Sequence, residues 1–447
     1  MPSRKSHHKT RRGCAPCKKR RVKCDEQYPS CNNCNKKSIT CSFLMIVPSS
    51  RLSPSPTLLP CLSAGVKAPF RVHVFQSSLI PPPPPKPSPL LLAFEECLED
   101  AAESFKSRGQ ELLHHYTTAT SKTLATDLPA QTVWQGAVLQ LAYSHRYLIH
   151  GLLAVTSLHL ARLRGDASER ALIATSASQF NIALSLFRDV VTNITEENCE
   201  ALYAFSTLVC VFIFITSQDE CKAILTPSPN TKQFDRRTQT NEMIRIEATR
   251  LRTVRGALVI LFPGWDWIVR GPLSPLCTRK WWPDTPTPVD AEAVVEDRQL
   301  AALKRLWLQP GRSFDYAFPV LAAALAELRS CFALVSQLTR NPAYVNRGSN
   351  GVYDRCANGK LVDRGAVFTW PIQVQGEFIA LLESQRPEAL AILAHYAILP
   401  GRVRGVWWME GWGVSLVTTA ALVLGAERKS WIEWPARVVG LEWENVL

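Results

Sequence analysis

The chain has 447 residues, of which 46% are hydrophobic, so most of it is expected to fold into two or three domains around a large core. Its formal net charge is +13, and residues 1–41 alone hold twelve Lys/Arg and two Asp/Glu. The basic character is therefore an amino-terminal feature, which favours a polyanionic partner, most simply nucleic acid.

Residues 1–13 are predicted to be a disordered basic arm, and residues 14–42 follow with six cysteines. Their spacing is C-x2-C-x6-C, repeated after six residues, so the segment is an internal repeat. Structural Zn2+ takes four tetrahedral ligands, and thiolate is a favoured donor. Six thiolates fill the eight ligand positions of two Zn2+ ions only if two of them bridge. The cysteines are Cys14, Cys17, Cys24, Cys31, Cys34 and Cys41.

Cations between the second and third cysteines offset the negative charge of such a cluster and help to keep its thiols deprotonated. They are Lys18, Lys19, Arg20, Arg21 and Lys23. A disulfide framework is the alternative, but it needs a secreted context, and the basic amino-terminal segment has no apolar signal region. The basic run could also be a plain charged surface or a nuclear-localisation patch.

The segment resembles the fungal Zn2Cys6 binuclear cluster, a DNA-binding module of transcription regulators. The resemblance includes all six cysteines, the run KKRRVK, Asp25 and Pro29. It implies that Cys14 and Cys31 bridge the two metals, that each C-x2-C opens a short helix, and that the first helix enters the major groove. We place that helix at residues 17–23.

The same resemblance implies a role for each basic residue. Arg20 and Arg21 are expected to contact base edges, with guanine O6 and N7 as natural acceptors. Lys18, Lys19 and Lys23 are expected to contact phosphates and to set the salt dependence of binding.

Residues 43–93 are predicted to be a proline-rich linker, because proline removes backbone donors and interrupts helices. The run PPPPPKP at 81–87 favours a stiff polyproline II spacer. Many Zn2Cys6 proteins dimerise through a heptad coiled coil just after the cluster, and prolines interrupt every candidate heptad here. The sequence leaves open the possibility of a homodimer formed without a zipper.

Residues 94–447 are predicted to form one α-helical regulatory domain. Apolar spacing predicts helices at 145–165 and in ERALIATSASQFNIALSLFRDVV, with Gly165 ending the first. Further helices are expected at 297–308 and 318–339, whereas 227–245 and 341–364 are expected to be loops.

Residues 201–218 are uncharged and reach the threshold length for a membrane span. We favour a helix buried in a large core, since a span usually needs about 20 apolar residues and flanking anchors. The shorter run at 412–426 receives the same interpretation.

A second resemblance extends over most of 94–447, to the carboxyl-terminal regulatory domain of the fungal sterol uptake control protein family. It implies an α-helical effector domain with an apolar pocket for a sterol-like or other apolar ligand. The segments that carry it are ELLHHYTTATSKTL, HGLLAVTSLHLA, NCEALYAFSTLV, WDWIVRGPLSPL, RPEALAILAHYA, WWMEGWG and SWIEWP.

These features predict a zinc-dependent, sequence-specific transcription factor of the nucleus, with double-stranded DNA, the transcription machinery and an apolar small molecule as partners. The rival hypothesis is a zinc-stabilised protein-interaction or lipid-binding protein that does not read DNA sequence. No nucleophile elbow, phosphate-binding loop or zinc-protease motif occurs in the sequence, so an enzyme is not expected.

Overall fold

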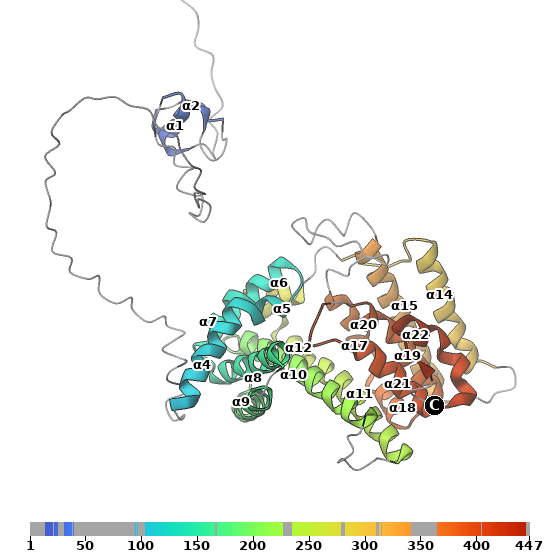
Figure 1. Cartoon of the computed structure of the whole chain (residues 1–447). Helices are drawn as coiled ribbons and strands as arrows, with labels where there is room; N and C mark the ends of the chain where they lie inside the picture. Colours follow the sequence, from blue (N-terminus) through green and yellow to red (C-terminus); the bar gives the residue numbers. More distant parts are fainter. Residues whose placement is uncertain are drawn as a thin grey trace, which may run out of the picture. The chain divides into compact units, whose positions relative to one another are not determined.

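The computed structural model describes a set of ordered segments that form two compact units, Met1–Pro83 and Pro84–Leu447. Every regular element among these segments is a helix (Figure 1), as the sequence predicts. The predicted arm 1–13 and linker 43–93 lie outside them. The described residues are 14–20, 22–25, 31–37, 39, 94, 96, 103–165, 168–226, 235–278, 282–309, 313, 315–340, 364–403 and 405–443.

The first unit contains two short helices, α1 (Ala15–Lys19) and α2 (Asn32–Asn35). The amino-terminal half of the second unit contains α4 (Glu103–His115), η2 (Tyr116–Thr120), α5 (Ser121–Thr123), α6 (Leu128–Thr132), η3 (Val133–Ala137), α7 (Val138–Ala142), α8 (Arg146–Arg164), α9 (Glu169–Val190), α10 (Cys199–Leu225), α11 (Arg236–Gly256), α12 (Leu258–Ile268) and α13 (Ser274–Cys277).

The carboxyl-terminal half continues with α14 (Ala291–Ala302), η4 (Leu303–Leu306), α15 (Ala317–Arg340), η5 (Arg364–Phe368), α17 (Thr369–Gln373), α18 (Gly376–Glu383), α19 (Pro387–Tyr396), α20 (Ile398–Arg402), α21 (Trp412–Leu424), η6 (Ala426–Ile432) and α22 (Glu433–Val439). The helix expected at 297–308 therefore begins earlier, at Ala291. The expected loop at 341–364 lies outside the described residues up to 363.

Helices α8 and α9 match their predicted positions and pack along each other, while α10 packs across α8. Gly165 ends α8 in the left-handed conformation, with φ of +56°, which glycine adopts without a steric penalty. Helix α8 is buried along most of its length, as its nearly continuous apolar sequence requires.

Helix α10 contains the uncharged run 201–218 and packs against α8, α11 and α12. Two described helices, Cys199–Leu225 and Ala317–Thr339, are long and apolar enough to cross a membrane, and more than half of each apolar window is buried within the fold. A helix surrounded by other helices must be apolar on all sides, which accounts for the composition of α10.

Helix α11 corrects the expected loop at 227–245, because residues from Arg236 onward are helical. Asp235 caps the helix by accepting a hydrogen bond from the backbone N–H of Thr238 at 3.2 Å. The sequence here is strongly polar because one part of α11 is exposed and carries ion pairs, such as that of Arg252 with Glu383. Figure 1 shows the carboxyl-terminal helices gathered beside α11, which contacts α17, α18 and α21.

A buried ion pair joins α10, α11 and α21. The guanidinium of Arg250 donates to Glu247 at 2.7 Å and to Gln218 at 3.2 Å. Glu247 also accepts from the hydroxyl of Ser415 at 2.7 Å and from the indole N–H of Trp412 at 3.2 Å. Both charged side chains are almost fully buried, so each is stabilised by hydrogen bonds from separate helices.

We predict that Glu247→Ala lowers the free energy of unfolding by about 3–5 kcal/mol, because it leaves the Arg250 charge buried without its partner. The matched control is Glu383→Ala, which breaks the exposed ion pair between Glu383 and Arg252, a residue of the same helix as Arg250. Its loss should lower the free energy of unfolding by about 0–1 kcal/mol. Denaturant unfolding of both variants measures the difference, and equal costs would contradict the argument.

Candidate metal centre and DNA-binding face

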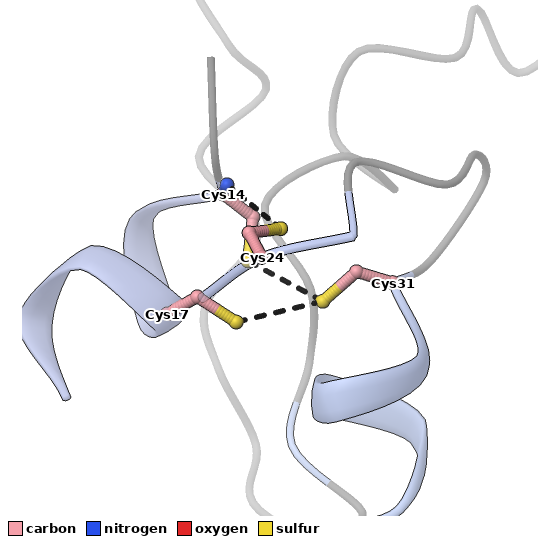
Figure 2. Close-up of side chains that lie close together, drawn as sticks. All are labelled: Cys14, Cys17, Cys24 and Cys31. Carbon is pink, nitrogen blue, oxygen red and sulfur yellow. Dashed lines mark hydrogen bonds between the residues drawn. The ribbon is translucent and has the colours of Figure 1, made fainter. Parts of the chain in front are cut away.

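Four cysteine side chains from the two halves of the repeat meet in the first unit (Figure 2). The sulfurs of Cys14, Cys17, Cys24 and Cys31 all lie within 4.8 Å of one another. The Sγ–Sγ distance is 3.6 Å for Cys14 with Cys31 and for Cys17 with Cys31. Cys14 and Cys17 lie close because their C-x2-C spacing places both on the first turn of α1, whereas Cys24 and Cys31 reach them from later in the chain.

These distances fit zinc coordination. Zn–S bonds of about 2.3 Å in a tetrahedron require sulfurs about 3.8 Å apart, close to the observed separations. Cys14 is also 3.6 Å from Cys34, so its sulfur touches ligands of both halves. Cys41 lies outside the described residues. The cluster domain binds two zinc ions, and the donor set suits them.

Deprotonation of the buried sulfurs also requires a cation close to them. Burial raises the pKa of the Cys14 thiol, and it raises the pKa of Cys31 to about 12. Buried thiols of this kind stay protonated at neutral pH unless a positive charge is close. A bound metal supplies that charge, so metal binding and thiol deprotonation are coupled.

The two halves of the repeat have the same backbone hydrogen bonds. The N–H of Lys18 donates to Cys14 O at 3.1 Å, and that of Asn35 donates to Cys31 O at 3.0 Å. The N–H of Val22 donates to Cys17 O, and seventeen residues further along the N–H of Ile39 donates to Cys34 O in the same way. The sequence repeat is therefore a structural repeat.

Three polar contacts hold the halves together, and sequence analysis assigned none of them. The carboxylate of Asp25 accepts from the backbone N–H of Asn32, at 3.2 and 3.1 Å to its two oxygens, and so caps α2. The Asn33 side chain donates to Lys23 O at 2.6 Å. Arg20 donates to Asn33 O at 3.3 Å. Capping patterns are sought within three residues, so a cap seven residues away has no local signal.

The predicted helix at 17–23 is wrong in its bounds, because α1 begins at Ala15 and ends at Lys19. Pro16 suits the first turn of a helix, and the chain must then turn back to bring Cys24 to the cluster. Lys23 consequently lies after the helix rather than on it.

The basic residues have different surroundings. Lys18, Lys19 and Lys23 are exposed, whereas Arg20 is half-buried and its guanidinium also lies 3.9 Å from the Cys17 sulfur. Arg21 lies outside the described residues. The first half of the repeat thus presents three exposed lysines, two of them on α1.

Comparisons with known proteins match two parts of the chain. Residues 12–48 match the fungal Zn(2)-Cys(6) binuclear cluster domain, and residues 111–229 match the fungal specific transcription factor domain. A Zn(2)-C6 fungal-type transcription factor of Gibberella zeae is 27% identical over 100% of this chain and 89% of its own length.

Two further relatives match shorter stretches. The Zn(2)-C6 fungal-type transcription factor afumD of Aspergillus fumigatus is 29% identical over 48% of this chain and 49% of its own length. Sterol uptake control protein 2 of Candida albicans is 61% identical over 41 residues, which are 9% of this chain and 6% of that protein.

A zinc cluster followed by a large helical domain defines the class as zinc-dependent DNA-binding regulators. Within that class, the chain contains the fungal Zn(2)-Cys(6) cluster domain and the fungal specific transcription factor domain, and its homologues are Zn(2)-C6 fungal transcription factors, including sterol uptake control proteins.

We predict that removal of zinc with EDTA abolishes DNA binding but leaves the thermal transition of the helical unit unchanged, because apolar burial rather than metal holds that unit together. Fluorescence anisotropy and circular dichroism measure the two effects. Cys34→Ser should reproduce the loss, whereas Cys277→Ser, in the helical unit, should not. Full DNA affinity in zinc-free protein would contradict the prediction.

Proposed function

We propose that the chain is a sequence-specific transcription factor that reads DNA through the first half of its zinc cluster. The supporting observation is the gathering of cysteine sulfurs beside a short helix whose Lys18 and Lys19 are exposed. The equivalent helix of the second half carries Asn35 and Lys36 at these positions, so the first half has the stronger attraction for phosphates.

The six cysteines are proposed to hold two Zn2+ ions, with Cys14 and Cys31 as the bridging ligands. The close approach of the Cys14 sulfur to Cys31 and Cys34 supports a bridging position for it. The metals would fix the direction of α1 relative to the second half and so present its side chains to the groove.

The proposed DNA contacts divide into two kinds. Arg21 and Arg20 contact base edges, and Lys18, Lys19 and Lys23 contact phosphates. The hydrogen bond from Arg20 to the backbone of the second half gives Arg20 a supporting role as well. That role reduces its freedom to reach a base, so Arg21 is the principal base-reading residue of this proposal.

The proposed domain organisation is a basic arm at 1–13, the cluster at 14–42, a linker at 43–93 and a regulatory domain at 94–447. The regulatory domain would control activity through an apolar ligand, sterol-like or other, and through the transcription machinery. Fungal Zn2Cys6 factors are generally nuclear and generally not enzymes, and we propose both for this chain.

Selection of binding sites from random double-stranded DNA, with zinc measured on the same sample, tests the proposal. An enriched guanine-containing element supports sequence reading. If zinc is bound and no element is enriched, the rival function holds, in which the cluster stabilises a protein-interaction or lipid-binding protein.

We predict that Arg21→Ala weakens binding to the selected site by about 1–3 kcal/mol and relaxes base preference, because a bidentate contact to guanine is lost. Lys19→Ala is the matched control. It should weaken binding to all sequences alike and reduce the slope of log affinity against log salt by about 1. Equal weakening on all sequences by Arg21→Ala would contradict its role.

A further inference from the structure

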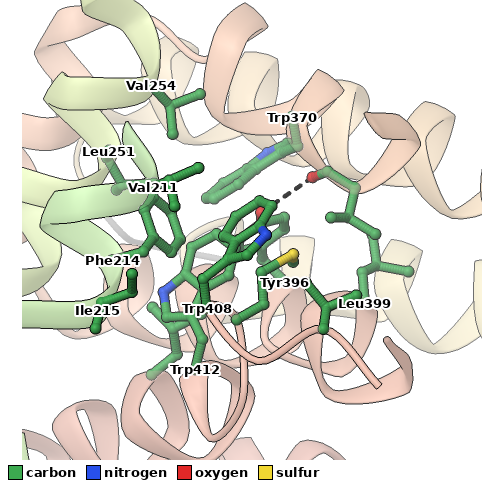
Figure 3. Packing of buried hydrophobic residues seen from close by; sticks show 14 of the residues in the cluster. Val211, Phe214, Ile215, Leu251, Val254, Trp370, Tyr396, Leu399, Trp408 and Trp412 are labelled. Carbon is green, nitrogen blue, oxygen red and sulfur yellow. Dashed lines mark hydrogen bonds between the residues drawn. The ribbon is translucent and has the colours of Figure 1, made fainter. Parts of the chain in front are cut away.

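The helical unit contains a cavity of about 220 Å³ that the DNA-binding function does not use. Its walls come from the segment 124–134, α10, α11, α13, the η5–α17 segment and Trp408, which are distant in sequence. Figure 3 shows Val211, Val254 and Trp408 of this lining, where α10 and α11 meet the carboxyl-terminal helices. A cavity built at such a junction is a common form of ligand site.

The volume limits the size of an occupant. A cavity of roughly 150 Å³ lined by aliphatic and aromatic side chains accepts benzene, whereas sites for drug-sized molecules occupy about 300–1,000 Å³. The observed volume lies between these values. It suits a molecule of one or two rings, whereas a sterol, with four fused rings and a side chain, would extend out of the open side of the cavity.

The lining determines the shape of an occupant. Four aromatic side chains face the cavity: Trp134, Tyr203, Phe368 and Trp408. The rings of Phe368 and Trp408 are stacked, with an interplanar angle of 17° and centroids 6.1 Å apart. Near-parallel rings in the lining favour a planar occupant, which packs against aromatic side chains by offset stacking.

Three polar side chains of the lining already have partners within the protein, whereas the indole N–H of Trp408 has none. The Asp127 carboxylate accepts from the N–H of Ala130 at 3.0 Å, and the Thr207 hydroxyl donates to Tyr203 O at 3.1 Å. The Arg364 guanidinium donates to Thr123 O at 2.6 Å and lies 5.1 Å from the centre of the Trp408 ring. An occupant therefore gains more from ring contacts than from a charge of its own.

The cavity also lacks a reactive thiol. The Cys210 thiol donates to Thr253 O at 3.4 Å, and burial raises its pKa to about 12. It stays protonated at neutral pH, so an occupant would be bound without covalent attachment.

We propose that this cavity binds a neutral, planar aromatic molecule of one or two rings, and that this molecule rather than a sterol is the regulatory ligand. The inference rests on the proposed regulatory role of the helical domain and names its ligand class. A larger cavity of about 290 Å³ lies beside residues 400–414, but a glycine-containing loop forms much of its wall, and among its described lining residues Trp407 alone is aromatic.

Six separate segments line the cavity, so an occupant that contacts several of them stabilises their common arrangement over any in which they separate. Trp134 belongs to the π-helical turn η3, and its carbonyl accepts the hydroxyl of Tyr116 from a second π-helical turn, η2, at 2.8 Å. Such turns are frequent at functional sites. The ligand thus connects the amino-terminal helices with η5 and Trp408.

Titration of the full-length zinc-loaded chain with 2-naphthol, a neutral two-ring probe, tests the proposal by calorimetry and thermal melting. We expect saturable binding and a higher melting temperature. Val211→Phe fills the cavity and should weaken binding at least about tenfold. Val259→Phe adds the same ring at an exposed position of α12 and should leave affinity within about twofold.

Ala257→Leu is a milder filling variant that serves if Val211→Phe does not fold. The proposal is overturned if neither filling variant weakens naphthol binding, if naphthol does not bind, or if ergosterol binds and is displaced by the filling substitutions while naphthol is not. DNA-site selection on the same preparations is independent of these outcomes, so failure of the ligand class is distinguishable from failure of DNA reading.

Discussion

The zinc cluster depends on one electrostatic constraint: several thiolates lie within a few ångströms of one another, and their negative charges must be compensated. Cys14 and Cys31 are buried, and their sulfurs lie 3.6 Å apart, an arrangement that is unfavourable for uncompensated negative charge. Two metal ions and the neighbouring cations resolve it. The lysines that follow Cys17 add positive charge beside these sulfurs, and under the proposed function they also contact the phosphates of DNA. On that proposal, the density of basic residues has two physical causes that act in the same direction.

The spacing of the cysteines predicted the metal centre because ligand chemistry is local in sequence. Two features of the same unit could not be predicted in that way. The helix ends at Lys19, because the chain must return Cys24 to the other sulfurs. The cap that Asp25 provides for Asn32 joins residues seven positions apart, so no pattern of adjacent residues encodes it. Both depend on closure of the cluster, which is a property of the folded unit.

In the helical unit, too, sequence patterns predicted some elements but not those that depend on contacts between distant segments. Apolar periodicity predicted α8 and α9, and the uncharged sequence of α10 indicated its burial. Helix α11 was not predicted in full, because its polar sequence resembles that of a loop until its partners are known. Glu247 and Arg250 are buried only because Gln218, Ser415 and Trp412 donate to or accept from them. A sequence shows the charges of such a network but not the helices that neutralise them.

The two units are stabilised by different interactions, and this difference constrains how the protein can be regulated. A segment of fewer than 40 residues buries too little apolar surface to fold alone, so metal binding supplies the folding free energy of the cluster. The helical unit has its own large apolar core and does not need zinc. Ligand binding in the helical unit therefore cannot repair a cluster that has lost metal. Under the proposed function, the ligand therefore stabilises the helical unit and the metals stabilise the cluster, so the two bound species act on separately folded units.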